Sequence, residues 1–186
     1  IIKFAKMADL VTVSTKCLQE EYKDYGIDAV VLKNTVDIDD YPTPLRNDSD
    51  VIRLGLSGSV AYSKDYEVIK PLLLELSKDK RFKLVVFSLP PNHPDFKWQR
   101  DEVYKAEIAF WDSLEVEWQH IVPMNEYIST LNNLRLDVML IPRADNWFNK
   151  CKSNLKYLES SMLEIPCIVS SFDGAPYEED EAIKAK

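Results

Sequence analysis

The chain has 186 residues, of which 46% are hydrophobic, and its formal net charge at pH 7 is -8. This length provides one sizeable core with an appendage rather than two full domains. The acidic excess argues against binding to nucleic acid or to an anionic lipid surface. The longest apolar runs, such as residues 138–142, are far shorter than the roughly 20 residues that span a bilayer, so no transmembrane segment is predicted.

The three cysteines are Cys17, Cys151 and Cys167. Their wide spacing does not suit a metal knuckle, and an odd count predicts no disulfide framework, so a reducing compartment, the cytoplasm, is expected. His93 has no second histidine or cysteine at ligand spacing, and no metal site is predicted. The chain opens at Ile1 without an initiator methionine or a signal peptide, and we expect a piece of a longer protein.

The first part of the chain reads as a strand, a helix and a strand, over residues 10–14, 16–25 and 29–33. We expect this unit to pack beside the main sheet, because its apolar strand residues would otherwise be exposed: Val11, Val13, Val30 and Leu32. Residues 34–50 are polar and contain two prolines, which predicts a linker.

The rest of the chain alternates short apolar runs with segments of helical period. The predicted strands cover residues 51–56, 83–88, 115–119, 137–141 and 166–170, and the predicted helices lie near residues 65–77, 99–113, 125–135 and 153–163. This α/β order predicts a doubly wound, Rossmann-like parallel sheet with helices on both faces. A ligand is expected in the loops after the strands, where the strand order reverses.

The loop after the first of these strands contains the small residues Ser57, Gly58 and Ser59. Small residues allow backbone amides to approach an anion. The loop lacks both the glycine spacing of a dinucleotide fingerprint and the Lys-Ser/Thr ending of a P-loop, so neither NAD nor a nucleoside triphosphate is indicated. An ordinary strand-to-helix turn explains the loop equally well.

Lys152, Lys156 and Glu159 are spaced i, i+4 and i+7. This spacing predicts one stripe on a helix with Ser153 as its N-cap, next to an apolar face formed by Leu155, Leu158 and Met162. Cations near a helix N-terminus disfavour the helix by itself, so a bound diphosphate explains them, and Glu159 is then placed to accept hydrogen bonds from a ribose. The alternative is an exposed Lys-Glu surface pair.

Arg143 and Asn149 follow the strand at residues 137–141 and are expected to face the same crevice. An arginine there can bind a phosphate group. An ordinary surface loop is the alternative.

Residues 148–159, Phe-Asn-Lys-Cys-Lys-Ser-Asn-Leu-Lys-Tyr-Leu-Glu, followed by the strand at 165–170, resemble the donor-site motif of the GT-B glycosyltransferases. The resemblance is closest to the glycosyl transferases group 1, family 4-like. Residues 8–14 and 31–37 resemble that family's interdomain passage, and residues 53–59 resemble the start of its donor domain. The matches lie in the family's order over nearly the whole chain.

The resemblance implies that residues 1–33 are a remnant of the acceptor-side domain and the passage, that 34–50 link the two parts, and that 51–186 form a C-terminally incomplete nucleotide-sugar-binding domain. It implies retaining, metal-independent transfer of a hexosyl group from a nucleotide-diphospho-sugar to an acceptor, in polysaccharide biosynthesis, with no cofactor besides this substrate. The missing N-terminal domain is the expected partner, and the chain alone is expected to be inactive. The implied catalytic residues are Lys152 and Lys156, the donor-binding residues are Ser57, Gly58, Ser59, Arg143, Asn149, Ser153 and Glu159, and the base-side loop contains Ile121 and Val122.

The sequence departs from the family pattern at several positions. The family commonly has two glutamates separated by seven residues; if Glu159 is the second, Cys151 stands at the first, and a carboxylate near the transferred sugar is missing. Glu164 and Thr35 replace two family glycines, so local backbone geometry is expected to differ. Two alternatives stay open: a non-catalytic nucleotide-binding module, and a sugar-nucleotide epimerase or a nicotinamide-dependent oxidoreductase of the same fold class. The missing glycine fingerprint argues against the oxidoreductase.

Overall fold

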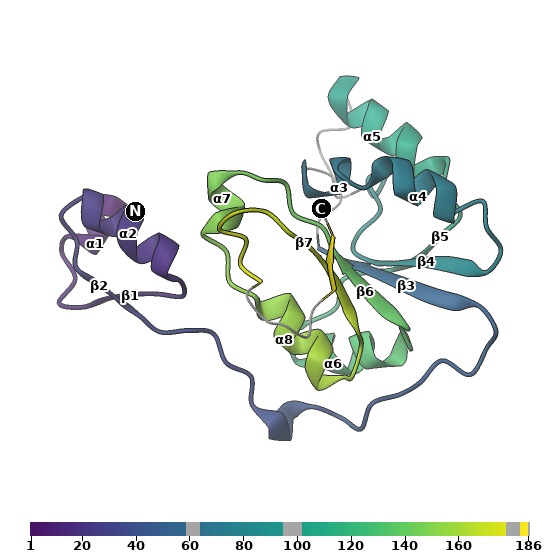
Figure 1. Cartoon of the computed structure of the whole chain (residues 1–186), viewed down its shortest axis with the longest axis horizontal. Coiled ribbons are helices and arrows are strands. Elements are labelled where there is room, and N and C mark those ends of the chain that lie inside the picture. Colours follow the sequence, from purple (N-terminus) through teal and green to yellow (C-terminus); the bar gives the residue numbers. More distant parts are fainter. Residues whose placement is uncertain (59–63, 95–101, 178–182, 186) are drawn as a thin grey trace.

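The computed structural model describes residues 1–58, 64–94, 102–177 and 183–185 (Figure 1). Its main sheet has six strands in the order β5-β4-β3-β6-β7-β8, and every neighbouring pair is parallel. The strands are β3 (Ile52–Ser57), β4 (Phe82–Phe87), β5 (Val116–Gln119), β6 (Val138–Ile141), β7 (Cys167–Ser170) and β8 (Ile183–Ala185). The predicted doubly wound parallel sheet is therefore confirmed, with β8 as an additional strand.

Helices cover both faces of this sheet (Figure 1). One face carries α3 (Lys64–Glu67), α4 (Lys70–Leu76) and α5 (Glu102–Asp112), and the other carries α6 (Met124–Asn133) and α8 (Leu155–Met162). The predicted single helix over residues 65–77 is two helices, because Pro71 lacks an amide hydrogen and lies in the first turn of α4.

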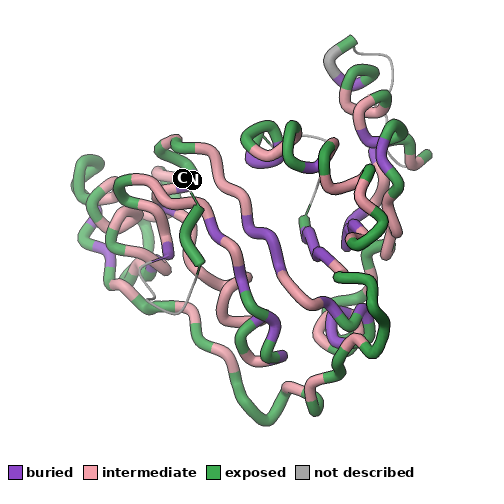
Figure 2. Tube along the Cα trace, turned by 45° about the vertical axis from the view of Figure 1, so that its right-hand side comes forward, coloured by how far each residue is buried: buried purple, intermediate pink, exposed green. Residues whose placement is uncertain are grey.

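Adjacent residues of β4 pack into different cores. Leu84 and Val86 pack with Trp111 of α5, whereas Val85 and Phe87 pack with Leu131 of α6. This alternation is the two-residue period of a strand buried on both faces. Figure 2 shows buried stretches of the chain along the strands of this sheet.

The strand order reverses between β3 and β6, which are direct neighbours through Leu54 and Val138. The chain runs from β3 through β4 to β5 at one edge, and then crosses back to β6, β7 and β8 on the other side of β3. In such sheets, ligands bind beyond the carboxyl ends of the strands at this reversal.

The N-terminal unit, residues 1–33, forms a separate two-stranded parallel sheet from β1 (Val11–Val13) and β2 (Ala29–Val31), with α1 (Ile2–Ala5) and α2 (Lys16–Asp24). Thr15 caps α2 by accepting a hydrogen bond from the Leu18 amide at 3.2 Å. The expectation that this unit covers its apolar residues is wrong for Val30 and Leu32, which are exposed, whereas Val13 is buried and Val11 is half-buried. An extended segment connects the unit to β3 (Figure 1).

Residues 34–50 contain the short 3-10 helix η1 (Ile38–Asp40) and otherwise run as an irregular chain. They are attached to the main domain by hydrogen bonds. The Leu45 amide donates to Asn132 Oδ1 at 2.9 Å, and Asn132 Nδ2 donates back to the Thr43 carbonyl at 2.9 Å. These two hydrogen bonds therefore attach the segment to the C-terminal end of α6.

Cys17 and Cys151 form a disulfide, with their Cα atoms 4.9 Å apart. The expectation of no disulfide is wrong, because an odd number of cysteines still permits one pair and the fold brings together residues 134 positions apart. Cys167 is free and buried. None of the helices in the described ranges is both long enough and apolar enough to cross a membrane.

Candidate functional site

The carboxyl ends of β3 and β6 open onto a cluster of charged side chains. β3 ends at Ser57 and is followed by Gly58, while β6 ends at Ile141 and leads through residues 142–146 into α7 (Trp147–Lys150). The cluster is formed by Asp65, Arg143, Asn149, Lys152 and Lys156. It lies at the reversal point where this fold class places its ligands.

Asp65 is the centre of this cluster, and its side chain is only 11% exposed. Its Oδ1 atom accepts hydrogen bonds from the Ala144 amide at 3.0 Å and from Asn149 Nδ2 at 2.6 Å. Its Oδ2 atom accepts one from Arg143 Nη1 at 2.9 Å and lies 3.6 Å from Lys152 Nζ. Burial by itself raises the pKa of Asp65, but the hydrogen bonds from Ala144, Arg143 and Asn149 outweigh it and hold this pKa below its usual value.

Sequence reasoning assigned no role to Asp65. An aspartate in the first turn of a helix is ordinarily explained by the helix dipole. Asp65 follows the end of a predicted strand, which is a weak sign that it lies near the ligand. Its hydrogen-bond partners could not be foreseen, because they lie at least 78 residues away in the sequence.

Lys156 reaches from α8 to the end of β3, where its ammonium group donates a hydrogen bond to the Ser57 carbonyl. Burial, together with the nearby charges of Arg143 and Lys152, lowers the pKa of Lys156 to about 8. Gly58 admits this ammonium group, because a Cβ there would lie 2.9 Å from Lys156 Nζ. Its φ of +108° also favours glycine.

The Gly58 amide donates to the Phe87 carbonyl at 3.2 Å, so it is used within the sheet region. Ser57 itself is buried. Ser59, the third residue of the predicted anion-binding loop, lies outside the described residues.

Lys156 and Glu159 both lie on α8, but the predicted three-residue stripe is wrong for Lys152, which precedes the helix. The N-cap of α8 is Asn154, and Ser153 instead accepts a hydrogen bond from Asn34 Nδ2 at 2.7 Å. The predicted apolar face is only half-buried; the fully buried residues in this part of the chain are Ser160 and Leu163.

Glu159 accepts a hydrogen bond from the Tyr127 hydroxyl at 3.2 Å. Burial raises the pKa of Glu159, although Tyr127 and Lys156 act in the opposite direction. Tyr127 stacks on Phe87 of β4, with ring centroids 5.2 Å apart. The Tyr127 hydroxyl therefore donates to Glu159, the residue predicted to accept from a ribose hydroxyl.

Arg143 and Asn149, which are predicted to face the same crevice, both contact Asp65. Asn149 is buried at 1% exposure and also donates to the Ala144 carbonyl at 2.8 Å. Arg143 Nε and Asn149 Oδ1 are buried atoms without a hydrogen-bond partner among the described residues. Buried polar atoms are normally paired; because the unpaired Tyr177 hydroxyl also interacts with Arg143, Asn149 Oδ1 is the clearer indication that a ligand completes this site.

Solved structures with a similar fold were found over nearly the whole chain. HepE of Anabaena, in complex with UDP and glucose, has a TM-score of 0.62 and 12% identity and covers 91% of this chain. TarM has a TM-score of 0.60 and 11% identity and covers 100% of this chain. The lipopolysaccharide outer core galactosyltransferase WaaB, in its apo form, has a TM-score of 0.50 and 19% identity and covers 89% of this chain.

The chain has the fold of the C-terminal half of a GT-B glycosyltransferase. The match covers 46% of HepE, 35% of TarM and 44% of WaaB, so the chain spans less than half the length of these proteins. No family model and no curated protein sequence matches the chain. At these identities the likeness establishes the fold alone, because one fold serves many activities.

Ile121 and Val122, predicted to lie beside the base, follow the end of β5, which β4 separates from β3. Ile121 is 63% exposed, whereas Val122 packs partly against the core. The preceding His120 forms an edge-to-face ring pair with His93, with centroids 5.5 Å apart. Ile121 and Val122 therefore lie on a different strand end from the charged cluster.

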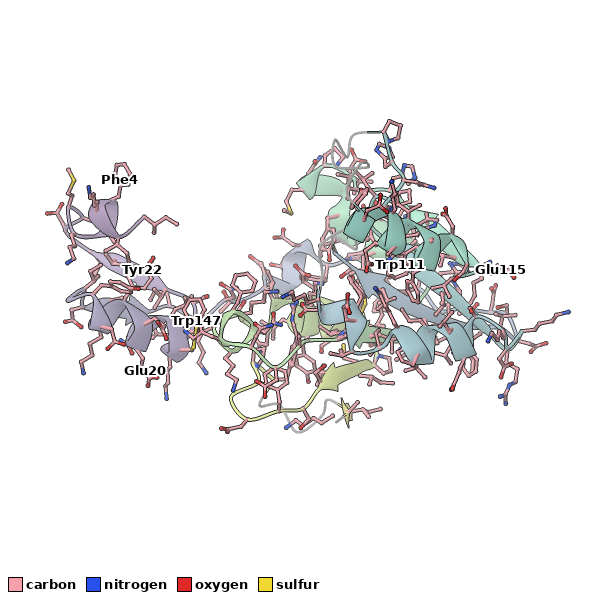
Figure 3. The ribbon with its side chains drawn as sticks, turned by 90° about the horizontal axis from the view of Figure 1, so that it is seen from above. Phe4, Glu20, Tyr22, Trp111, Glu115 and Trp147 are labelled. Atoms are coloured by element: carbon pink, nitrogen blue, oxygen red, sulfur yellow. A yellow bond between two sulfur atoms is a disulfide. The ribbon has the colours of Figure 1, made fainter. Side chains whose placement is uncertain are left out.

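The N-terminal unit touches this GT-B half beside the charged cluster. Trp147 Nε1 donates to Glu21 of α2, and Thr15 Oγ1 donates to the Cys151 carbonyl at 3.0 Å. Figure 3 shows Trp147 at the junction of the two parts. With the Cys17–Cys151 disulfide, these contacts fix the N-terminal unit to the segment that leads into α8.

Glu164 stands where the GT-B resemblance expects a glycine, and its φ is +54°. The left-handed backbone of a glycine is therefore kept, contrary to the expectation that the geometry differs here. A non-glycine residue in this conformation costs on the order of 1 kcal/mol. Arg46 donates to both the backbone carbonyl and the side chain of Glu164.

Proposed function

We propose that this chain binds the donor of a glycosyltransferase, a nucleotide-diphospho-sugar, from which a sugar is transferred to an acceptor. The observation that carries this proposal is the convergence of Arg143, Lys152 and Lys156 at the strand-order reversal. Arg143 and Lys152 flank Asp65 at 2.9 and 3.6 Å, and Lys156 reaches the end of the adjoining strand. Three cations against two carboxylates, Asp65 and Glu159, leave this cluster with an excess of one positive charge, which suits a diphosphate.

The same side chains suit the chemistry of transfer. As the bond between the sugar C1 and the diphosphate oxygen breaks, its electron pair stays on that oxygen and negative charge builds on the diphosphate. Lys152, Lys156 and Arg143 stabilise this charge, and an acceptor oxygen forms the new bond to C1 and loses its proton. We propose that these side chains neutralise the diphosphate without a metal ion, and that the transfer retains the anomeric configuration.

Glu159 is proposed to bind the ribose hydroxyls, taking over the bond that Tyr127 now makes at 3.2 Å. Ser57, Gly58, Ser59, Asn149 and Ser153 are proposed to shape the donor site, and Ile121 with Val122 to lie beside the base. HepE was crystallised with UDP and glucose, which supports uridine as the first base to test.

We propose that residues 1–33 belong to an acceptor-side domain, that residues 34–50 link it to the donor side, and that residues 51–186 belong to the donor domain. We expect this chain to bind the donor and to require the acceptor-side domain for turnover. The lipopolysaccharide galactosyltransferase WaaB supports a hexosyl transfer in polysaccharide biosynthesis.

A second candidate is a non-catalytic nucleotide-binding module. It is favoured by Cys151, which occupies the position of an expected carboxylate and is bonded to Cys17. Release of sugar from a labelled donor by the complete protein supports the transferase. Donor binding without release or transfer supports the module.

The cytoplasmic location predicted from the cysteine count remains a proposal, and the Cys17–Cys151 pair provides a test of it. Disulfides persist in oxidising compartments, whereas cytosolic thiols are kept reduced. Rapid alkylation of intact cells followed by mass spectrometry should find free thiols at both positions if the protein is cytoplasmic. A disulfide in most of the protein would argue for a compartment outside the cytoplasm.

A thermal-shift panel of uridine, guanosine and adenosine diphosphates, and of their sugars, tests donor binding. At a ligand concentration about 100 times Kd, binding contributes about 2.7 kcal/mol, which raises Tm by roughly 5–10 °C for a chain of this size. Lys156→Met should abolish most of this shift. The matched control is Lys105→Met, because Lys105 is 54% exposed on α5 and pairs with Glu102. If no nucleoside diphosphate at millimolar concentration shifts Tm, the proposal fails.

A further inference from the structure

Asp65 places a negative charge where an anionic ligand is expected. Its carboxylate is nearly enclosed and has hydrogen-bond donors on both oxygens. A carboxylate that opposes phosphate binding is costly for a donor site unless it has a task there. The groups that Asp65 binds indicate its role.

The partners of Asp65 are held with different strengths. Ala144, Asn149 and Arg143 donate at 3.0, 2.6 and 2.9 Å. Lys152 lies at 3.6 Å, its side chain is 30% exposed, and its ammonium group also lies 4.5 Å from the centre of the Phe148 ring. Lys152 is therefore a loosely held cation beside a firmly held group.

We propose that Asp65 is the internal counter-ion of the donor site: it holds Arg143 and Lys152 while the site is empty, and it releases Lys152 to an incoming diphosphate. The proposal rests on the proposed function, since it assumes that the crevice binds a diphosphate. Asp65 is then a positioning residue that sets the affinity of the site for phosphate groups.

The arrangement also explains why a cluster of three cations folds. Arg143 is 11% exposed and interacts with Asp65 and Tyr177; burial raises the pKa of Tyr177, so Asp65 is the anionic one of these two neighbours at neutral pH. A buried charge without a partner is strongly destabilising. Asp65 thus stabilises the empty fold, and the cost of this stabilisation is weaker binding of an anion.

Arg143 Nε and Asn149 Oδ1 give an independent indication that a ligand completes this cluster. Both are buried atoms without a hydrogen-bond partner among the described residues, although Asp65 binds the other end of each side chain. Arg143 Nε can donate to a phosphate oxygen, and Asn149 Oδ1 can accept from a sugar hydroxyl or a water molecule.

Asp65→Asn tests the proposal with inorganic pyrophosphate as the probe. The variant keeps the size of the side chain and removes its charge. We expect a lower Tm without ligand, a larger rise of Tm on adding pyrophosphate, and a Kd for pyrophosphate at least about tenfold tighter, since at an effective dielectric constant of about 20 even an opposing charge about 12 Å away changes affinity about tenfold. A purely structural role would lower both the starting Tm and the affinity.

The matched control is Asp145→Asn. Asp145 lies in the loop that contains Arg143 and Ala144, and it pairs with Lys150 at 3.0 Å, but its side chain is 58% exposed. The variant Asp145→Asn also removes one negative charge. Because solvent screens an exposed pair, we expect the pyrophosphate Kd to change by less than about twofold. In the double variant Asp65→Asn with Lys152→Met, the gain in affinity should be largely lost, because the released cation is gone.

Unchanged or weaker pyrophosphate binding by a folded Asp65→Asn chain would overturn the counter-ion proposal. If that chain does not fold, Asp65→Glu decides: it keeps the charge and should bind pyrophosphate within about threefold of the unchanged chain, and any larger change in either direction rejects the proposal. Failure of the unchanged chain to bind pyrophosphate or any nucleoside diphosphate would instead reject the proposed function. The two failures are therefore distinguishable.

Discussion

Raising the pH from about 7 to about 10 should weaken the binding of a nucleoside diphosphate, because it removes the proton from Lys156. The ammonium group lies against the Ser57 carbonyl, and burial lowers its pKa from 10.5 to about 8. Above that pH the affinity should fall about tenfold per pH unit. The fall should level off when the contribution of one charge-assisted contact is lost, after roughly 5- to 150-fold, or about 1–3 kcal/mol.

Isothermal titration calorimetry across this pH range measures the effect. Lys156→Met is the control, because protonation of the ligand itself affects both proteins equally. The difference between the two profiles belongs to Lys156. The stability of the empty protein provides a second measurement: between pH 8 and 10.5 the unfolded chain keeps a proton that the folded chain has lost, so this group's contribution to the free energy of unfolding rises with pH. Parallel binding profiles for the two chains would refute the reasoning.

Three further results are expected. Glu159→Gln should weaken a nucleoside diphosphate and its nucleoside by a similar factor of about tenfold, because both carry the ribose; calorimetric titration showing loss for the diphosphate alone would contradict the ribose role. Gly58→Ala puts a Cβ 2.9 Å from Lys156 Nζ in a backbone with φ +108°, and denaturant titration should find the fold destabilised by about 1–2 kcal/mol. Reducing the Cys17–Cys151 bond, whose ends are 134 residues apart, should lower the free energy of unfolding by at most about 5 kcal/mol, and Cys17→Ser should match the reduced protein; no response to reductant would mean that the bond is not formed.

The sheet was predictable from the sequence because its signals are local. The run at residues 84–87 is apolar at every position, which predicts a strand buried on both faces, and these residues enter two different cores. Lys156 and Glu159 were correctly placed on one helix for the same reason, since residues three apart are neighbours on a helix surface whatever surrounds it. The position of Lys152 was missed because a helix start depends on which side chains are free to cap it, and Ser153 is engaged by Asn34.

The tertiary structure decided the partners of the buried charges. Asp65 meets Arg143 and Asn149 across 78 and 84 residues of sequence, and Cys17 meets Cys151 across 134. Such pairs form only after β6 has been placed beside β3, and the order of strands in a sheet follows from the packing of the whole chain rather than from the period of any one segment. The sequence by itself therefore determined the strands β3 to β7, most of the helices between them, and the placement of Lys156 and Glu159 on α8. The counter-charge at the centre of the site, the disulfide and the exposure of Val30 and Leu32 were decided by how distant segments pack.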